Sequence, residues 1–122
     1  MATKTFAEYG YLGLLFGESS VREVESRDIE AAKADEKAEH AVWIRFYDRE
    51  EAEIDGETLV GKPKNYSKTY MINGEPMTLE EVKRDHADER ILISNMEGNG
   101  YDRVWKTTHG RFTQLPEDAV ID

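Results

Sequence analysis

The chain has 122 residues, of which 16 are basic and 26 acidic, giving a net charge of −10, and it contains no cysteine. This length suits one domain over residues 1–122, and a hydrophobic share of 39% argues against disorder. The acidic balance disfavours duplex nucleic acid as a partner, and the lack of cysteine excludes disulfides, thiolate metal sites and cysteine nucleophiles.

The apolar runs and the charge distribution indicate the cellular location of the protein and the half of the chain that suits an anion. No run approaches the roughly 20 apolar residues that a membrane span needs, and YLGLLF at 11–16 follows too little positive charge to resemble a secretion signal. We therefore expect a cytoplasmic protein with no membrane partner. Residues 1–61 hold 7 basic and 15 acidic residues, whereas residues 62–122 hold 9 and 11, so an anion site is expected in the second half.

The N-terminal third predicts a strand followed by a helix. A strand is expected from Tyr9 to Phe16, where Gly10 and Gly13 indicate a bulge or a close backbone approach. Residues 21–25 either continue that strand or begin a turn. Alanines and long charged residues at 28–40 then predict a helix that Asp28 caps.

Residues 41–47 form the strongest strand pattern of the chain. Alternation gives it one apolar face and one face with two aromatic residues around an arginine; these are Val42, Ile44 and Phe46, and Trp43, Arg45 and Tyr47. The aromatic face suits stacking on a base, a subunit interface or plain packing.

The second half continues as turns, short strands and one more helix. We expect a turn at 55–56, a strand at 69–72, a turn at 73–74 and a helix from the capping box at Thr78 to about His86. Residues 90–94 predict a buried strand, paired across a turn at 98–100 with a strand at 101–108, and strands follow at 111–114 and 119–121. The expected fold is α+β, an antiparallel sheet with two helices.

The segment ILISNMEGNGYDRVWKTTHGR at 91–111 carries the clearest ligand chemistry. Arg103 can fork onto a phosphate, Asn95 and Asn99 can read an amide or a purine edge, and the glycines allow backbone N–H groups to approach an anion. The alternative is structural: the turns only close hairpins, Asp102 pairs with a nearby cation, and Trp105 is core.

The sequence gives little indication of a catalytic or metal site. The three histidines are dispersed without ligand spacing, and neither a GxSxG context nor a phosphate-binding GxxxxGK loop occurs. We therefore expect no metal site, no cofactor and no enzymatic turnover.

Four motifs within residues 41–121 carry a resemblance to a known family: YDR at 47–49, DGETLVGKPKNYS at 55–67, TLEEVK at 78–83 and ISNMEGNGYDRV at 93–104. The tract resembles the phage type 1 Thoeris anti-defence family, sponges that sequester cyclic ADP-ribose-type immune signals. The resemblance implies a non-catalytic protein of the host bacterial cytoplasm that holds a glycocyclic ADP-ribose isomer between the protomers of a homodimer. It also implies assembly into hexamers and, in some members, binding of cyclic oligonucleotides.

The last motif also implies particular site residues. It carries over Asn95, Asn99, Asp102 and Arg103, with Arg103 as the phosphate clamp. The family pattern has an arginine where this chain has Thr108, which leaves Lys106 and Arg111 as substitutes. Since lysine cannot form a bidentate fork, the geometry of the clamp is expected to differ here.

Chemistry adds three further candidates: Trp43 and Tyr70 for stacking on adenine, and Arg45 for reaching a shared ligand across a dimer interface. Two other functions stay open. One is an acidic DNA mimic that uses residues 18–57 to block a bacterial defence nuclease, and the other is a nucleotide-cleaving enzyme.

Overall fold

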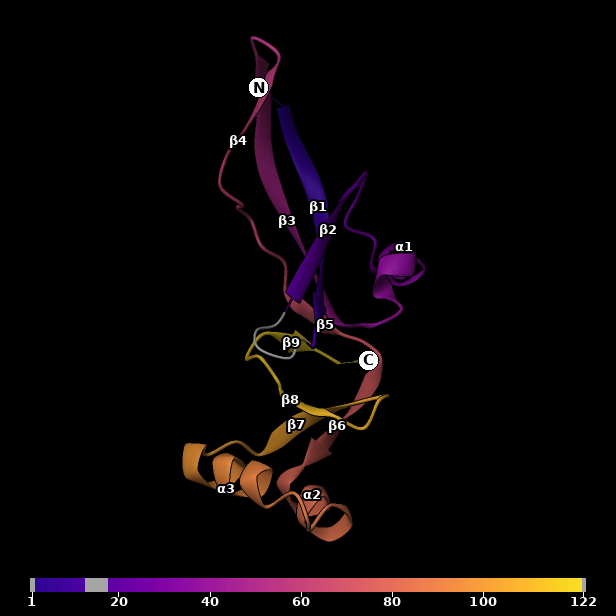
Figure 1. The fold of residues 1–122 in the computed structure, drawn as a ribbon, viewed down its shortest axis with the longest axis vertical. Helices are drawn as coiled ribbons and strands as arrows, with labels where there is room; N and C mark the ends of the chain where they lie inside the picture. Colours follow the sequence, from indigo (N-terminus) through magenta and orange to yellow (C-terminus); the bar gives the residue numbers. More distant parts are fainter. Residues whose placement is uncertain (1, 13–17, 122) are drawn as a thin grey trace.

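The computed structural model describes residues 2–12 and 18–121. It is a mixed α+β structure dominated by antiparallel pairing, as predicted, but it contains two sheets and three α-helices rather than one sheet and two helices. The two sheets follow one another along the long axis of an elongated molecule (Figure 1). The large sheet has the order β2-β1-β3-β5-β9 with β4 beside β3, and the small sheet has the order β6-β7-β8.

The large sheet is built around β3, which lies between β1 and β5. Its strands are β1 (Ala2–Tyr11), β2 (Glu18–Val24), β3 (Ala41–Ile54), β4 (Glu57–Val60), β5 (Thr69–Met71) and β9 (Ala119–Val120). β3 is longer than predicted because it continues into a hairpin with β4. The predicted turn at Asp55 and Gly56 is confirmed, with φ of 53° and 78°. The last strand, β9, pairs with β5 in parallel.

The first strand starts earlier than predicted and ends at Tyr11. The close approach expected at Gly10 is confirmed, because a Cβ there would lie 1.8 Å from Cε2 of Trp43, and the register shifts between Gly10 and Tyr11. Gly13 and the rest of the predicted strand to residue 16 reach beyond the described residues. The segment at 21–25 is largely strand, as part of β2.

The helix predicted at 28–40 is two short pieces, α1 (Ile29–Lys33) and the 3-10 helix η1 (Glu36–Ala38). Asp28 caps α1 as predicted, and Asp35 starts η1 by accepting a hydrogen bond from the Lys37 backbone N–H. A second capping aspartate favours a second start over a continuous helix. Both pieces pack a small residue, Ala32 or Ala38, onto the large sheet. The core formed there consists of Ala7, Tyr9, Ala32, Ala38, Ala41, Ile44, Phe46 and Ile72.

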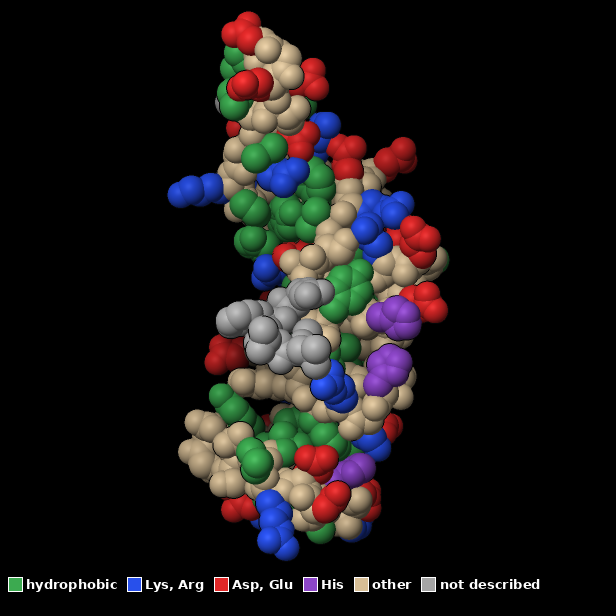
Figure 2. All heavy atoms as spheres, viewed as in Figure 1, with side chains coloured by type: hydrophobic (Ala, Val, Ile, Leu, Met, Phe, Trp, Pro, Cys, Tyr) green, Lys and Arg blue, Asp and Glu red, His purple; other side chains and the backbone are tan. Residues whose placement is uncertain are grey.

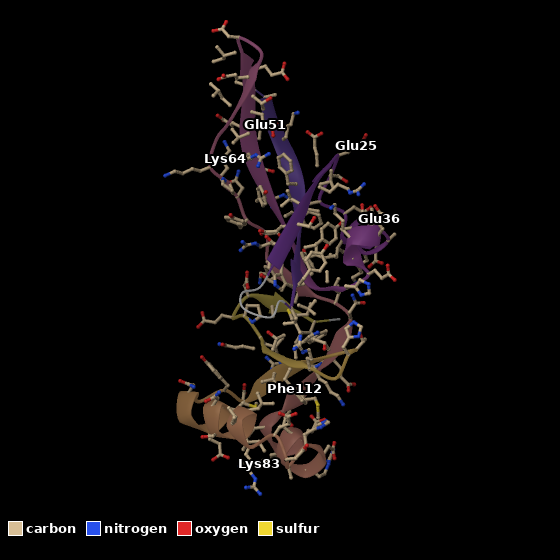
Figure 3. The ribbon with its side chains drawn as sticks, in the orientation of Figure 1. Glu25, Glu36, Glu51, Lys64, Lys83 and Phe112 are labelled. Atoms are coloured by element: carbon tan, nitrogen blue, oxygen red, sulfur yellow. The ribbon has the colours of Figure 1, made fainter. Side chains whose placement is uncertain are left out.

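The small sheet is covered by two helices in a second core. The elements are β6 (Gly74–Thr78), α2 (Leu79–Asp85), α3 (Arg90–Asn99), β7 (Arg103–Thr107) and β8 (Phe112–Gln114). The core consists of Met77, Val82, Met96 and Val104, with Leu79, Leu92, Ile93 and Phe112 packed against it. Phe112 lies between the sheet and these helices (Figure 3). Lys83 of α2 forms an ion pair with Glu97 of α3 at 3.0 Å.

The predicted strand at 90–94 is wrong, because residues 90–99 form helix α3. Leu92, Ile93 and Met96 lie three and four residues apart, which puts them on one helical face against the core. The predicted turn at 98–100 is the end of that helix, where Gly100 caps it with a φ of 71°. β7 therefore pairs with β6 and β8 instead of with residues 90–94.

Candidate functional site

A pocket of about 360 Å³ lies between the two sheets. Strands β3 and β5 form one wall, and β8 with the segment after it forms the other; the lining residues are Trp43, Arg45, Thr69, Met71, Thr113, Gln114 and Pro116. Small-molecule sites are typically concave and largely apolar with a few polar groups, and commonly measure roughly 300–1,000 Å³. The pocket fits that description, with a volume near the lower end of the size range.

Arg45 is held firmly in the pocket wall. Its guanidinium carbon lies 4.3 Å from the ring centre of Tyr66 and 5.3 Å from that of Trp43, and its Nε donates to Glu8. Since the Glu8 carboxylate already neutralises Arg45, a phosphate at this position has to compete with an ion pair. Arg45 therefore contributes more to shaping the pocket than to capturing an anion.

The same face of the large sheet continues as a packed aromatic layer. Tyr66 lies 5.5 Å from Tyr47, Tyr47 lies 5.6 Å from Phe6, and the Arg49 guanidinium lies 4.3 Å from Phe6, all measured to ring centres. Phe6 and Tyr47 are buried. The aromatic face of the predicted strand is therefore mostly packing within the chain, and the pocket lies at its Trp43 end.

The register between β7 and β8 places Arg103 close to the pocket. It shares one face of β7 with Trp105, whose partner on β8 is the pocket residue Thr113. Two residues of a strand span about 7 Å, so the Arg103 side chain begins within reach of the pocket. Arg103 is exposed and, within residues 2–12 and 18–121, has no ion-pair partner.

The other predicted cations lie elsewhere. Lys106 faces the helices, where its Nζ is 3.3 Å from Nε2 of His86, and with Thr108 it lines a separate pocket of about 440 Å³. Arg111 is exposed beside the β7–β8 turn, and its carbonyl accepts from the Thr107 backbone N–H. Arg103 and Thr107 stand at opposite ends of β7, roughly 13 Å apart along the strand. The backbone therefore does not place Arg103 and Arg111 at one phosphate.

The predicted polar and aromatic partners are also dispersed. Asn95 and Asn99 are exposed on α3, where the Asn99 side-chain amide donates to the Asn95 carbonyl at 2.8 Å. Asp102 is exposed between α3 and β7. Tyr70 points away from the pocket, since its neighbours on β5 line it while Tyr70 packs edge-on to Phe46 in the core. Of the ten predicted residues, the structure places only Trp43 and Arg45 in the lining of this pocket.

Sequence reasoning missed most of the pocket lining. Thr69 and Met71 alternate with Tyr70, so a strand at 69–72 predicts that they share a face, but not what they face. Thr113, Gln114 and Pro116 reach the pocket only because β8 lies next to β7 and the chain then returns to the large sheet through β9. No local pattern marks such a contact.

The described residues offer neither a cluster of metal ligands nor a membrane-spanning helix. In the described part of the chain, no group of three or more His, Asp or Glu side chains could hold a metal ion. Within the same part, none of the helices has the length and apolar character needed to cross a membrane.

No family model, no curated protein and no solved structure matches this chain.

Proposed function

We propose that this protein captures a small phosphorylated nucleotide of the cyclic ADP-ribose type and holds it without cleaving it. The observation that carries the proposal is the pocket between the sheets, where the Trp43 ring lies in the wall. Arg103, which has no ion-pair partner among the described residues, lies on the adjoining face of β7. The motif resemblance to the phage anti-defence sponges supports the same ligand class. In the bacterial host, such a protein would deprive a Thoeris effector of its signal.

The side chains around the pocket match the parts of this ligand. Trp43 offers an aromatic surface for adenine, Thr113 and Gln114 offer groups for ribose hydroxyls and base edges, and Arg103 offers a fork for a phosphate. Apart from Arg45 the lining side chains are neutral, which suits holding a ligand better than transferring its protons. A pocket at the lower end of the usual size range favours a ligand shared with a second copy in a homodimer, or in a hexamer built from dimers.

Calorimetry with cyclic ADP-ribose isomers tests the proposal. We expect saturable binding to the wild-type protein, weakened by about tenfold in Trp43→Ala and Arg103→Ala because stacking and phosphate pairing each contribute about 1–3 kcal/mol. Arg90→Ala is the matched control, since Arg90 is an exposed arginine at the start of α3, outside the lining of this pocket. Binding that is absent, or equal in all variants, contradicts the site.

Recovery of the ligand separates capture from catalysis. After hours of incubation and denaturation of the protein, chromatography should return the ligand unchanged. Appearance of linear ADP-ribose or another product in proportion to the amount of protein would instead establish a nucleotide-cleaving enzyme.

One observation favours a second function, that of an acidic mimic of DNA. The β3–β4 hairpin extends past the end of β1 and carries Glu53, Asp55 and Glu57, and acidic side chains gather at its tip (Figure 2). A basic nuclease cleft would accept such a surface. If the protein is a mimic, it should inhibit the nuclease, and replacing these three carboxylates by amides should abolish that inhibition. If it is a sponge, the wild type should not inhibit the nuclease, and the same variant should bind the nucleotide as the wild type does.

A further inference from the structure

The fold brings together two histidines that are far apart in the sequence. His40 precedes β3 of the large sheet, and His109 lies in the turn between β7 and β8 of the small sheet. Their ring centres are 6.1 Å apart with an angle of 34° between the planes, and both residues are exposed. Figure 2 shows two histidine side chains next to each other on the surface.

This separation is slightly wider than that of two imidazoles on one metal ion. With metal–nitrogen distances of about 2.1 Å, two imidazoles that share an ion place their ring centres roughly 5–6 Å apart. Both side chains are exposed, so their torsions are free to direct one nitrogen of each ring at a common point. Neutral imidazole is a preferred ligand of Zn²⁺, Cu²⁺ and Ni²⁺.

The two segments that carry the histidines are fixed by the same residue. The Asn73 side-chain amide donates to the carbonyls of Ala38 at 2.8 Å and Ala41 at 2.7 Å, on either side of His40. The Asn73 carbonyl accepts from the Thr108 backbone N–H at 2.8 Å, directly before His109. Because both backbones are held before any ion arrives, the entropy lost on coordination is reduced.

We propose that His40 and His109 together bind one divalent transition-metal ion, with Zn²⁺ as the representative. Water completes the coordination shell, because the described residues provide no third His, Asp or Glu at this place. The ion would join the segment before β3 to the β7–β8 turn, and so link the two sheets at the surface. This site is separate from the nucleotide pocket and does not depend on the function proposed for it.

Calorimetric titration of untagged protein with Zn²⁺ at pH 7.5 tests the proposal. We expect one ion per chain and an affinity at least tenfold weaker in both His40→Ala and His109→Ala, since each variant removes one of two ligands. His86→Ala is the matched control, because His86 contacts Lys106 and Phe112 instead, and it should bind as the wild type does. A thermal scan with Zn²⁺ should raise the melting temperature only of the proteins that bind.

Several results would overturn the site. The first is a wild-type protein that takes up no Zn²⁺ at 1 mM. The others are a loss of Zn²⁺ affinity in only one of the two histidine variants, and an equal loss of affinity in His86→Ala. Circular dichroism first establishes that each variant is folded. If an alanine variant fails to fold, His40→Gln and His109→Gln replace it, and retained affinity in those proteins would also exclude the pair.

Discussion

At the scale of single residues, two glycines of the small-sheet half should respond in opposite ways to the same change. A Cβ on Gly74 would lie 2.4 Å from the Lys106 carbonyl oxygen and 2.4 Å from Nε1 of Trp105, whereas a Cβ on Gly98 meets nothing within 4 Å. Gly74→Ala should therefore destabilise the protein by about 1–3 kcal/mol through steric overlap. Gly98→Ala, inside α3, should stabilise it by about 0.5–1 kcal/mol. Urea unfolding measures both, and equal effects would contradict the packing around Gly74.

Asp48 gives the fold a defined dependence on acid. Hydrogen bonds from Asn65 and Thr5, and then the Arg27 guanidinium, lower the pKa of this carboxyl below its usual value. A lowered folded-state pKa adds stability above the unfolded pKa of about 3.9, and that stability is lost as the pH falls through the folded pKa. Asp48→Asn should therefore be less stable than the wild type at pH 7 and approach it near pH 2. Urea midpoints across this range test it, with the exposed Glu53→Gln as control.

Several residue-level features follow directly from local chemistry. Asp28 as a cap, the positive φ at Asp55 and Gly56, and the close contact at Gly10 are each determined by neighbours in the sequence or by one adjacent strand. The partner of Arg45 could not be predicted in this way. Glu8 is 37 positions earlier and reaches Arg45 only because β1 pairs with β3 at that register.

At the scale of elements, helix α2 depends on its predicted capping box. The Thr78 Oγ1 accepts from the Glu81 backbone N–H at 3.2 Å, and the Glu81 carboxylate accepts from the Thr78 backbone N–H at 3.3 Å. Thr78→Ala should cost about 1 kcal/mol of stability, because the first turn then keeps unsatisfied donors. Thr78→Ser, which retains the oxygen, should lose much less. Thermal unfolding of the two variants distinguishes the cap from the rest of the side chain.

Helix α3 shows where local patterns mislead. The segment from Arg90 to Ser94 contains two isoleucines, which favour a strand, and the following Gly98 and Gly100 suggest a hairpin turn. The helical spacing appears only when Met96 is counted with Leu92 and Ile93. Met96 is buried in the core with residues of α2 and β7, and the partly buried Leu92 and Ile93 pack against that core. The structure therefore places Asn95 and Asn99 on an exposed helix and not in the predicted loop. It also lacks the hairpin that was expected to gather the ligand groups.

At the scale of the whole molecule, the pocket results from how two sheets meet. β3 supplies Trp43 and Arg45 from the first half of the chain, and β8 with the segment after it supplies Gln114 and Pro116 from its end. The alternation that puts Trp43 on its face of β3 is visible in the sequence, and so is the more even balance of basic and acidic residues in the second half. Their meeting requires the parallel pairing of β9 with β5, which brings the C-terminal segment back to the large sheet.

Asn73 should determine whether the two sheets unfold together. Its side-chain amide donates to carbonyls of Ala38, Glu39 and Ala41, which belong to the large-sheet core or its border, while its own backbone leads into β6. Asn73 has a φ of 55°, which glycine adopts without strain, so Asn73→Gly removes the hydrogen bonds and keeps the backbone. At about 1 kcal/mol for each bond to Ala38 and Ala41, we expect a loss of roughly 2 kcal/mol.

Asn73→Gly should also weaken the coupling between the unfolding of the two sheets. Hydrogen exchange in wild-type protein should protect peptides from β3 and β7 to a similar degree, because both open in the same event. In Asn73→Gly, peptides from β7 and α2 should exchange faster than those from β3, since the small-sheet half is then attached mainly through the chain and the Trp105 Nε1 bond to Ile72 at 3.2 Å. Asn65→Gly is the matched control, as Asn65 also has a φ of 55° but bonds within the large-sheet half. Equal exchange in both halves of Asn73→Gly would show that the sheets are joined by other contacts.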